Sequence, residues 1–315
     1  MKQVIYHHQA IGPHMEGFIN YKQQQGYSYT KERYLLSKFD LFLVKHNYSA
    51  SVLSDSIINE YIDNTASMGP VFRNSCLSCM KLFSQYLNML FPESYTLNDL
   101  PIKIHKPSCY YIYSQHEICS LMNAAGNLSQ RGGLRRPCIR FMIGLLACTG
   151  LRINEALSLT LGDIDLHRRR LFVRKAKFDK QRYVPLSEST VQKIKEWLTI
   201  RGKYAADSAH SYLLVTDPTG QRMSYDCARR AFSTCRSQCE IGCRGKQPRL
   251  HDLRHTCACR CLQHWLLQGK DINAKLPVLS TALGHVDISS TQVYLHITPT
   301  QLQAASKRFY SLYNI

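Results

Sequence analysis

Long apolar runs are missing from this sequence. In 315 residues no uninterrupted apolar stretch reaches the roughly 18 residues of a membrane-spanning helix, and residues 1–10 do not resemble a secretory signal. We therefore expect no membrane association and a cytoplasmic location. Acidic residues are also few, 22 against 40 Lys and Arg, and no carboxylate pair suited to two-metal chemistry stands out. The sequence thus indicates neither a bound metal nor another cofactor.

The cysteines lack the arrangement of a disulfide scaffold. They number 13, an odd count, in a long chain without an export signal. Cys76 and Cys79 form a CxxC motif with no second pair nearby, and Cys235, Cys239 and Cys243 recur every four residues. We expect structural thiols, because free cysteine is readily buried. A zinc-dependent DNA-binding module on the last three is the weakest alternative.

Positive charge is unevenly distributed. Residues 1–106 contain 10 Lys and Arg against 8 Asp and Glu, whereas residues 107–315 contain 30 against 14. Such asymmetry indicates that the second part meets a polyanion, most commonly nucleic acid. The alternative is a basic surface that only maintains solubility.

The first part of the chain has the pattern of a small helical domain. We expect Thr30 to be the N-cap of one helix, a second helix to cover 52–64, and a third to begin at Pro70 and end by Pro92. Prolines and weak periodicity then indicate a linker. The predicted division is a helical domain at 1–100, a linker at 101–112 and a second domain at 113–315.

The second part is predicted to be mainly helical with one hairpin. A helix is expected to begin near Asn154. Extended runs at 170–176 and 181–186 flank a tight turn. Further helical patterns cover 115–125, 137–149, 188–201, 225–239, 252–268, 276–283 and 291–294, a strand is expected at 212–216 and a loop at 268–271. The fold class is therefore mainly α with a small antiparallel β-sheet.

Four short motifs occur in the second part in a distinctive order. They are TGLRINEAL at 149–157, KAKFDKQRYVPL at 175–186, HDLRHT at 251–256 and LGHVD at 283–287, followed by Tyr294 nine residues after His285. Each alone is weak, but together their order and spacing resemble the tyrosine recombinase, or phage integrase, family. The helical first part, 1–100, also fits the DNA-binding core-binding domain of that family, and 113–315 would then be its catalytic domain.

The resemblance implies a role for each matching residue. Arg152 and Arg254 would hold the scissile phosphate, His251 would assist proton transfer, Lys177 would be the general acid, His285 would support the phosphate, Glu155 would brace the site and Tyr294 would be the nucleophile. Ala176 and Phe178 replace the glycines usual around the hairpin lysine, so Lys175 and Lys180 remain alternatives to Lys177.

Physical chemistry makes this set of residues sensible. Phosphoryl transfer gathers negative charge on oxygens, which the forked donors of guanidinium groups match well. A tyrosine with a pKa of about 10 is a weak nucleophile until its surroundings favour the phenolate. The leaving 5′ oxygen needs a proton, which a lysine can supply. A phosphotyrosyl bond retains the bond energy, so ATP is not needed.

The resemblance implies a site-specific recombinase, of a simple Xer-like or transposon-borne type, that forms a 3′-phosphotyrosyl intermediate. Its partners would be duplex DNA at a specific site and further copies of itself, in a homo-tetramer on paired sites with a C-terminal exchange segment at 298–315. Further DNA contacts are expected from Lys22, Lys31, Arg33, Arg73 and Lys81, besides Lys175 and Lys180. The alternatives are a type IB topoisomerase-like enzyme and a catalytically silent DNA-binding accessory protein.

Overall fold

The chain forms two compact units, Met1–Ser108 and Cys109–Ile315. The computed structural model describes residues 5–98, 110–129, 133–174, 181–205, 208–239, 241, 247–285 and 287–296. The boundary between the units falls within the interval 101–112. Within the described residues, no helix is both long enough and apolar enough to cross a membrane.

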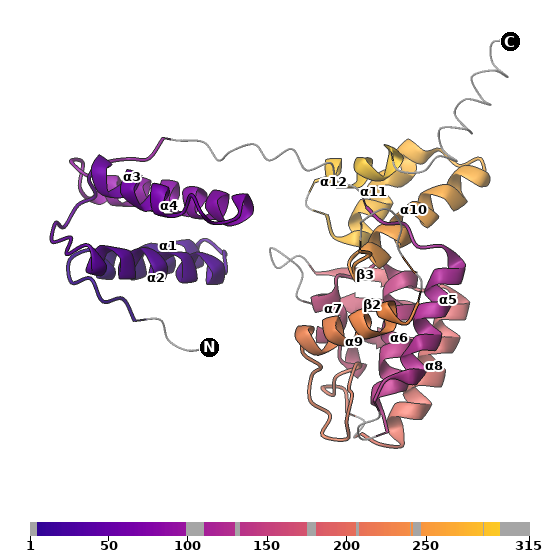
Figure 1. The fold of residues 1–315 in the computed structure, drawn as a ribbon. Coiled ribbons are helices and arrows are strands. Elements are labelled where there is room, and N and C mark those ends of the chain that lie inside the picture. Colours follow the sequence, from indigo (N-terminus) through magenta and orange to yellow (C-terminus); the bar gives the residue numbers. More distant parts are fainter. Residues whose placement is uncertain are drawn as a thin grey trace, which may run out of the picture. The chain divides into compact units, whose positions relative to one another are not determined.

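Four helices make up the described part of the first unit (Figure 1). Their bounds are α1 Gly12–Gln24, α2 Thr30–Lys45, α3 Asp55–Asn64 and α4 Pro70–Leu90. Their apolar faces meet in one core, in which Phe18, Phe39 and Phe83 are fully buried. The buried Asp40 accepts hydrogen bonds from the backbone N–H groups of His7 and His8 and so fastens the N-terminal segment to α2.

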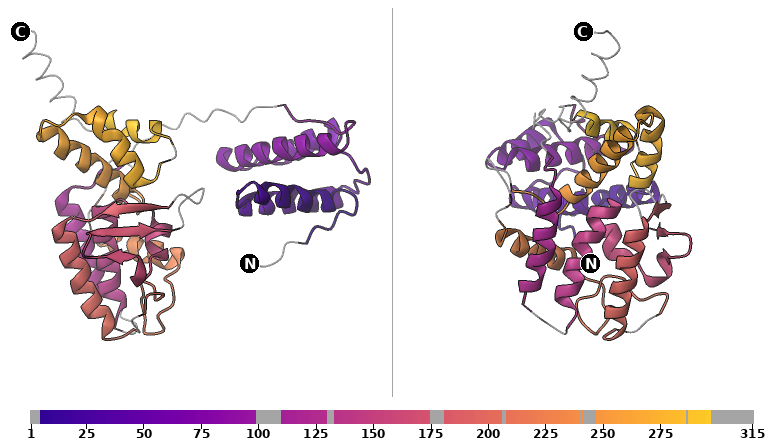
Figure 2. Two further views of the ribbon diagram at one scale, coloured as in Figure 1. Left: turned by 180° about the vertical axis from the view of Figure 1, so that it is seen from behind. Right: turned by 90° about the vertical axis from the view of Figure 1, so that its right-hand side faces the viewer.

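The second unit combines helices with one small sheet, as Figure 2 shows. Its elements are α5 Gln115–Ala124, η1 Ala125–Asn127, α6 Arg135–Thr149, α7 Ile153–Ser158, η2 Leu161–Asp163, β1 Ile164–Asp165, β2 Arg170–Val173, β3 Arg182–Pro185, α8 Glu188–Gly202, α9 Tyr225–Ser237, α10 Asp252–Leu267, α11 Ile272–Leu283, α12 Ser289–Gln292 and η4 Val293–His296. The predicted fold class, mainly α with a small antiparallel sheet, is confirmed.

The sheet has the strand order β1-β2-β3, with both pairs antiparallel. Leu171 lies opposite Val184, and both are buried in the main core of the unit. Because side chains alternate along a strand, Arg182 shares the buried face with Val184. The register therefore directs a positive charge into the protein.

A second apolar cluster of this unit joins α10, α11 and η4. It contains Ala258, Cys259 and Leu262 of α10 and Leu276, Leu279 and Leu283 of α11, together with Tyr294. The chain that enters this unit is tied to α10, because the N–H of Tyr113 donates to Thr256 Oγ1 at 2.9 Å and its hydroxyl donates to the Arg249 carbonyl at 3.0 Å. The last helices are thus fixed on the unit that carries the motifs.

Several expectations for the first unit were wrong at helix starts. We predicted no element over Gly12–Gln24, where the structure has α1, although Pro13 in the first turn is a helix-start signal. The second expected helix begins at Asp55 and not at residue 52, because Ser54 is its N-cap and the backbone of Leu53 is bonded to Ser94 and Tyr95. Thr30 is the first helical residue, and Tyr29 occupies the cap position with a φ of 45°.

The strand expected at 212–216 is not formed. Tyr212 makes one isolated bridge to Thr160. The carbonyls of Tyr212 and Leu213 accept hydrogen bonds from the side chains of Arg201 and Trp197, so they cannot extend a ladder.

Two elements also differ in extent from the prediction. Helix α11 begins four residues before the expected 276 and is capped by Asp271, and the expected helix at 291–294 is divided between α12 and η4. The loop at 268–271 is confirmed.

Candidate active site

The C-terminus of α11 is the structural centre of the candidate site. Gly284 adopts a left-handed conformation, with a φ of 69°, and ends the helix. The N–H groups of Gly284 and His285 turn back to the carbonyls of Thr281 and Ser280, a Schellman-type ending. The last carbonyls of a helix have no partner within it and carry its negative dipole end, so they attract cations.

Two arginines from distant motifs converge on these carbonyls. Arg254, 2% exposed, donates from Nη2 to the carbonyl of Leu283 at 2.7 Å and from Nη1 to that of Gly150 at 2.8 Å. Arg152 donates to the carbonyls of Leu283 at 3.3 Å and Gly284 at 2.8 Å. Two guanidinium groups separated by about a hundred residues in sequence therefore share one carbonyl, Leu283.

Glu155 connects Arg152 to a third arginine, Arg182 of β3. The Glu155 carboxylate, 5% exposed, accepts from Arg152 Nη1 at 2.9 Å and from both terminal nitrogens of Arg182 at 3.0 and 2.8 Å. It also accepts from the N–H of Arg152, the arrangement expected of an acidic residue three positions into a helix. Burial would raise the pKa of Glu155, but hydrogen bonds and charge from Arg182 and then Arg152 lower it.

Arg182, like Arg152, also donates a hydrogen bond to the end of α11. Its Nε donates to the carbonyl of Ala282 at 2.8 Å, again at the end of α11. A Cβ atom built on Gly284 would lie 2.7 Å from Arg182 Nη1. Position 284 therefore requires glycine both for its backbone conformation and for the space that Arg182 occupies.

Tyr294 of η4 lies beside this cluster and is buried, with 3% of its surface exposed. Its hydroxyl lies 2.9 Å from His255 Nδ1, and its ring stacks on that of His285 at a centroid distance of 6.2 Å. Burial raises the pKa of Tyr294 to about 12, although the positive charge of Arg254 opposes this shift. The phenol is therefore protonated in the protein without DNA.

The histidines around Tyr294 are kept neutral. Burial, followed by the charges of Arg254, Arg152 and Arg182, lowers the pKa of His285 to about 4. Its Nδ1 lies 2.7 Å from Thr291 Oγ1, which fixes the ring. Partial desolvation of the ring, and then the charge of Arg254, also lower the pKa of His251, part of whose side chain reaches the solvent at the start of α10. Burial lowers the pKa of Arg254 to about 10, so it remains charged at neutral pH.

The structure brings together six of the seven residues to which the resemblance gave catalytic or supporting roles. Arg152, Glu155, Arg254, His285 and Tyr294 are linked through the end of α11 and its apolar cluster, and His251 contacts His255 edge-on at 4.8 Å. The hairpin residues Lys175, Lys177 and Lys180 lie outside the described residues.

Two residues of this site had no role in the sequence analysis. Arg182 could have been found because it alternates with a buried valine along a strand, where a charge needs a carboxylate partner. His255 follows His251 by four residues, so the two lie on the same side of α10.

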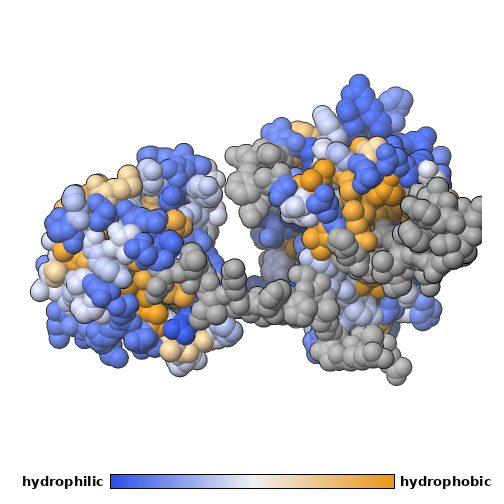
Figure 3. Space-filling model, turned by 90° about the horizontal axis from the view of Figure 1, so that it is seen from above, coloured by the Kyte–Doolittle hydropathy of each residue, from blue (hydrophilic) through white to orange (hydrophobic). Residues whose placement is uncertain are grey.

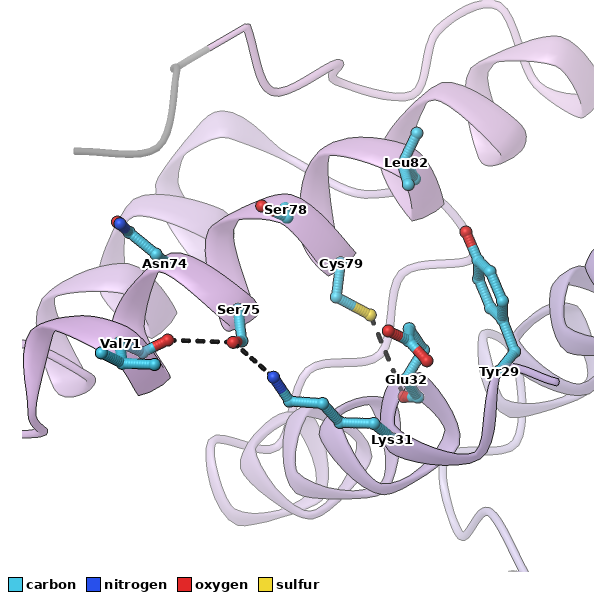
Figure 4. A pocket seen from close by; sticks show the side chains of 9 residues that line it. All are labelled: Tyr29, Lys31, Glu32, Val71, Asn74, Ser75, Ser78, Cys79 and Leu82. Atoms are coloured by element: carbon cyan, nitrogen blue, oxygen red, sulfur yellow. Dashed lines mark hydrogen bonds between the residues drawn. The ribbon is translucent and has the colours of Figure 1, made fainter. Parts of the chain in front are cut away.

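The DNA-contact candidates of the first unit differ in their surroundings. Figure 4 shows Lys31 of α2 reaching Ser75 of α4, with Nζ 2.6 Å from Oγ. Arg33 is bound in two hydrogen bonds to Glu16, which offsets its charge. Lys22 lies over the ring of Tyr21, Lys81 donates to the carbonyl of Asn98 at 3.4 Å, and Arg73 is half-buried.

Comparison with known proteins gives a consistent family. The model described as "Phage integrase family" matches residues 113–301, more than half of the chain. An integrase/recombinase, y4rB, of Sinorhizobium fredii is 37% identical over 63% of this chain and 65% of its own length. The tyrosine recombinase XerD of Rickettsia conorii is 29% identical over 87% of this chain and 89% of its own length.

A solved structure shares the fold. The Tn1549 transposon integrase, in complex with a circular intermediate DNA, superposes with a TM-score of 0.64 at 15% identity. The match covers 94% of this chain and 99% of that one. The similarity extends over both units, although the chain covers slightly less than two thirds of the y4rB relative.

We predict that Glu155→Gln lowers the free energy of unfolding by about 3–5 kcal/mol at neutral pH, because Arg182 then stays buried without its counter-charge. The folded-state pKa of Glu155 lies below its ordinary 4.5. Its stabilising contribution is therefore complete above that value and is lost as pH falls through the folded-state pKa. Urea denaturation at a series of pH values should show the gap between wild type and variant closing in acid.

The control for this experiment is Glu196→Gln. Glu196 is an exposed partner of Lys193, and its loss should change stability by less than about 0.5 kcal/mol. A Glu155→Gln variant as stable as the control, or a gap independent of pH, would contradict the assigned role of the carboxylate.

Proposed function

This chain is a tyrosine recombinase of the phage integrase family, and we propose that Tyr294 is the residue through which it cleaves and rejoins DNA. The observation that carries the proposal is the convergence of Arg152 and Arg254 on the Leu283 carbonyl, beside the buried Tyr294. Fixed guanidinium groups next to a hydroxyl nucleophile are what phosphoryl transfer to tyrosine requires.

In the proposed reaction Arg152 and Arg254 bind the non-bridging oxygens of the scissile phosphate. Tyr294 Oη forms a bond to phosphorus while the bond to the 5′ oxygen breaks, and Lys177 donates a proton to that oxygen. His285 supports the phosphate from the loop after α11, and His251 assists proton transfer. Rejoining reverses these steps with another 5′ hydroxyl, so the phosphotyrosyl bond supplies the energy.

The proposed partner is duplex DNA at a specific site, which the basic second part of the chain supports. Contacts from the first unit would come from Lys22, Lys31, Arg73 and Lys81, with a smaller part for Arg33 because Glu16 already binds it. From the hairpin, Lys175 and Lys180 would reach the backbone. An arginine whose charge is already offset by a nearby carboxylate gains less binding energy from a DNA phosphate.

The proposed assembly is a homo-tetramer on two paired sites, located in the cytoplasm. Figure 3 shows apolar surface gathered over part of the second unit. Exposed apolar side chains of the last helices include Val278 of α11, Ile288 just before α12 and Val293 of η4. These could receive the C-terminal segment 298–315 of a neighbouring copy, a segment that lies outside the described residues.

We predict that a nicked suicide duplex from the native flanking DNA is trapped as a covalent adduct. Without metal or ATP, wild type should give a protein–DNA band on a denaturing gel, and Tyr294→Phe should give none, because the variant lacks the hydroxyl that lies beside the two arginines. Tyr204→Phe, which alters an exposed tyrosine, should behave as wild type.

An adduct that survives Tyr294→Phe would assign the nucleophile elsewhere. Tight DNA binding without any adduct would favour an accessory protein. Relaxation of a supercoiled plasmid that lacks the site would instead favour a type IB topoisomerase-like activity.

We also predict that Lys177→Ala slows cleavage by about 10²–10³-fold, the usual contribution of a general acid. Replacing the bridging 5′ oxygen with sulfur should restore the rate, because a thiolate leaves without a proton. Lys175→Ala and Lys180→Ala are the matched controls and should not respond to sulfur. Rescue of either control, but not of Lys177→Ala, would move the acid to that lysine.

A further inference from the structure

His255 occupies a position next to the reactive oxygen that the reaction outlined above leaves unused. It is on α10 directly after Arg254, is 7% exposed, and places Nδ1 2.9 Å from Tyr294 Oη. When the imidazole carries its proton on Nε2, Nδ1 accepts the phenolic hydrogen. The hydrogen bond therefore joins a potential base directly to the oxygen that must lose a proton.

Aromatic groups enclose this pair. The ring of Tyr110 lies against the imidazole of His255 at a centroid distance of 4.2 Å, and 6.2 Å from the ring of Tyr294. Burial, then the neighbouring imidazole of His251, lowers the pKa of His255 to about 4, with a further contribution from Arg254 and an opposing one from Asp252. The imidazole is therefore neutral at physiological pH, which is the form able to take a proton.

The geometry points to His255 as the general base of cleavage, which takes the phenolic proton onto Nδ1. This inference rests on the proposed role of Tyr294 as the nucleophile. As Tyr294 Oη bonds to phosphorus, its O–H bond breaks and the proton passes to His255, while the 5′ oxygen leaves with a proton from the general acid. Transfer and bond formation proceed together, because the phenol oxygen loses its basicity as it joins phosphorus. On rejoining, His255 returns the proton to Tyr294.

The position of His251 fits a different task. Its side chain is partly exposed and its ring meets His255 edge-on at 4.8 Å, whereas it is His255 that lies within hydrogen-bonding distance of the Tyr294 hydroxyl and can accept its proton. General bases act within hydrogen-bonding reach of the proton that they remove, a condition that His255 meets. His251 can then exchange protons between His255 and solvent or support the phosphate.

The test combines His255 variants with tyrosine analogues at position 294. His255→Phe keeps a ring, and His255→Gln keeps a hydrogen-bond acceptor, but neither accepts a proton. Both should slow single-turnover adduct formation by about 10²–10³-fold with DNA binding and thermal stability retained. Fluorinated tyrosines of progressively lower phenol pKa at position 294 should restore the rate in these variants, while wild type responds weakly. His264→Gln, an exposed histidine of the same helix, should match wild type.

Three outcomes would overturn the role of His255. The first is an unchanged rate of adduct formation in His255→Phe. The second is full activity in His255→Gln, which would mean that His255 only positions Tyr294. The third is a slower rate that fluorinated tyrosines at position 294 do not restore. Failure of the proposed function is separate: it appears as an absent adduct in wild type or an adduct that persists in Tyr294→Phe.

Discussion

The end of α11 and the buried carboxylate of Glu155 hold the arginines of this molecule in place. Arg182 donates a hydrogen bond to the carbonyl of Ala282, and Arg254 donates to that of Leu283. Arg152 donates to the carbonyls of both Leu283 and Gly284. Three cations so close would repel one another, and Glu155 offsets two of them directly. In the proposed reaction, guanidinium groups that are already held in place lose little freedom when the phosphate binds, and electrostatic catalysis obtains most of its effect from such preorganisation.

Burial also controls the protonation state of three groups at the candidate site, namely Tyr294, His255 and His285. Tyr294 stays a phenol with a pKa of about 12, while the imidazoles of His255 and His285 stay neutral with pKa values of about 4. In the proposed reaction the cations attract a phosphate, and the tyrosine stays a phenol until one arrives. The apolar cluster of α10 and α11 disfavours a charged phenolate at Tyr294, so the phenol keeps its proton in the protein without DNA.

Much of this arrangement could be predicted from the sequence, because it depends on short motifs and on periodicity. The order of Arg152, His251, Arg254, His285 and Tyr294 indicated the family, and the extended runs at 170–176 and 181–186 around a tight turn indicated the hairpin. What the sequence could not reveal depends on contacts across the fold. The strand expected at 212–216 fails because Trp197 and Arg201 take its carbonyls, and the importance of Arg182 arises from a partner 27 residues away.

The most direct test of the account is a double-mutant cycle between Glu155→Gln and Arg182→Gln, measured as the single-turnover rate of adduct formation. If the pair acts as one unit that positions Arg152, the double variant should be about as slow as the slower single variant, because the second change removes nothing further. The contrary result is a double variant in which the two rate reductions multiply, so that each substitution slows adduct formation by its full single-variant factor. That result would contradict the account.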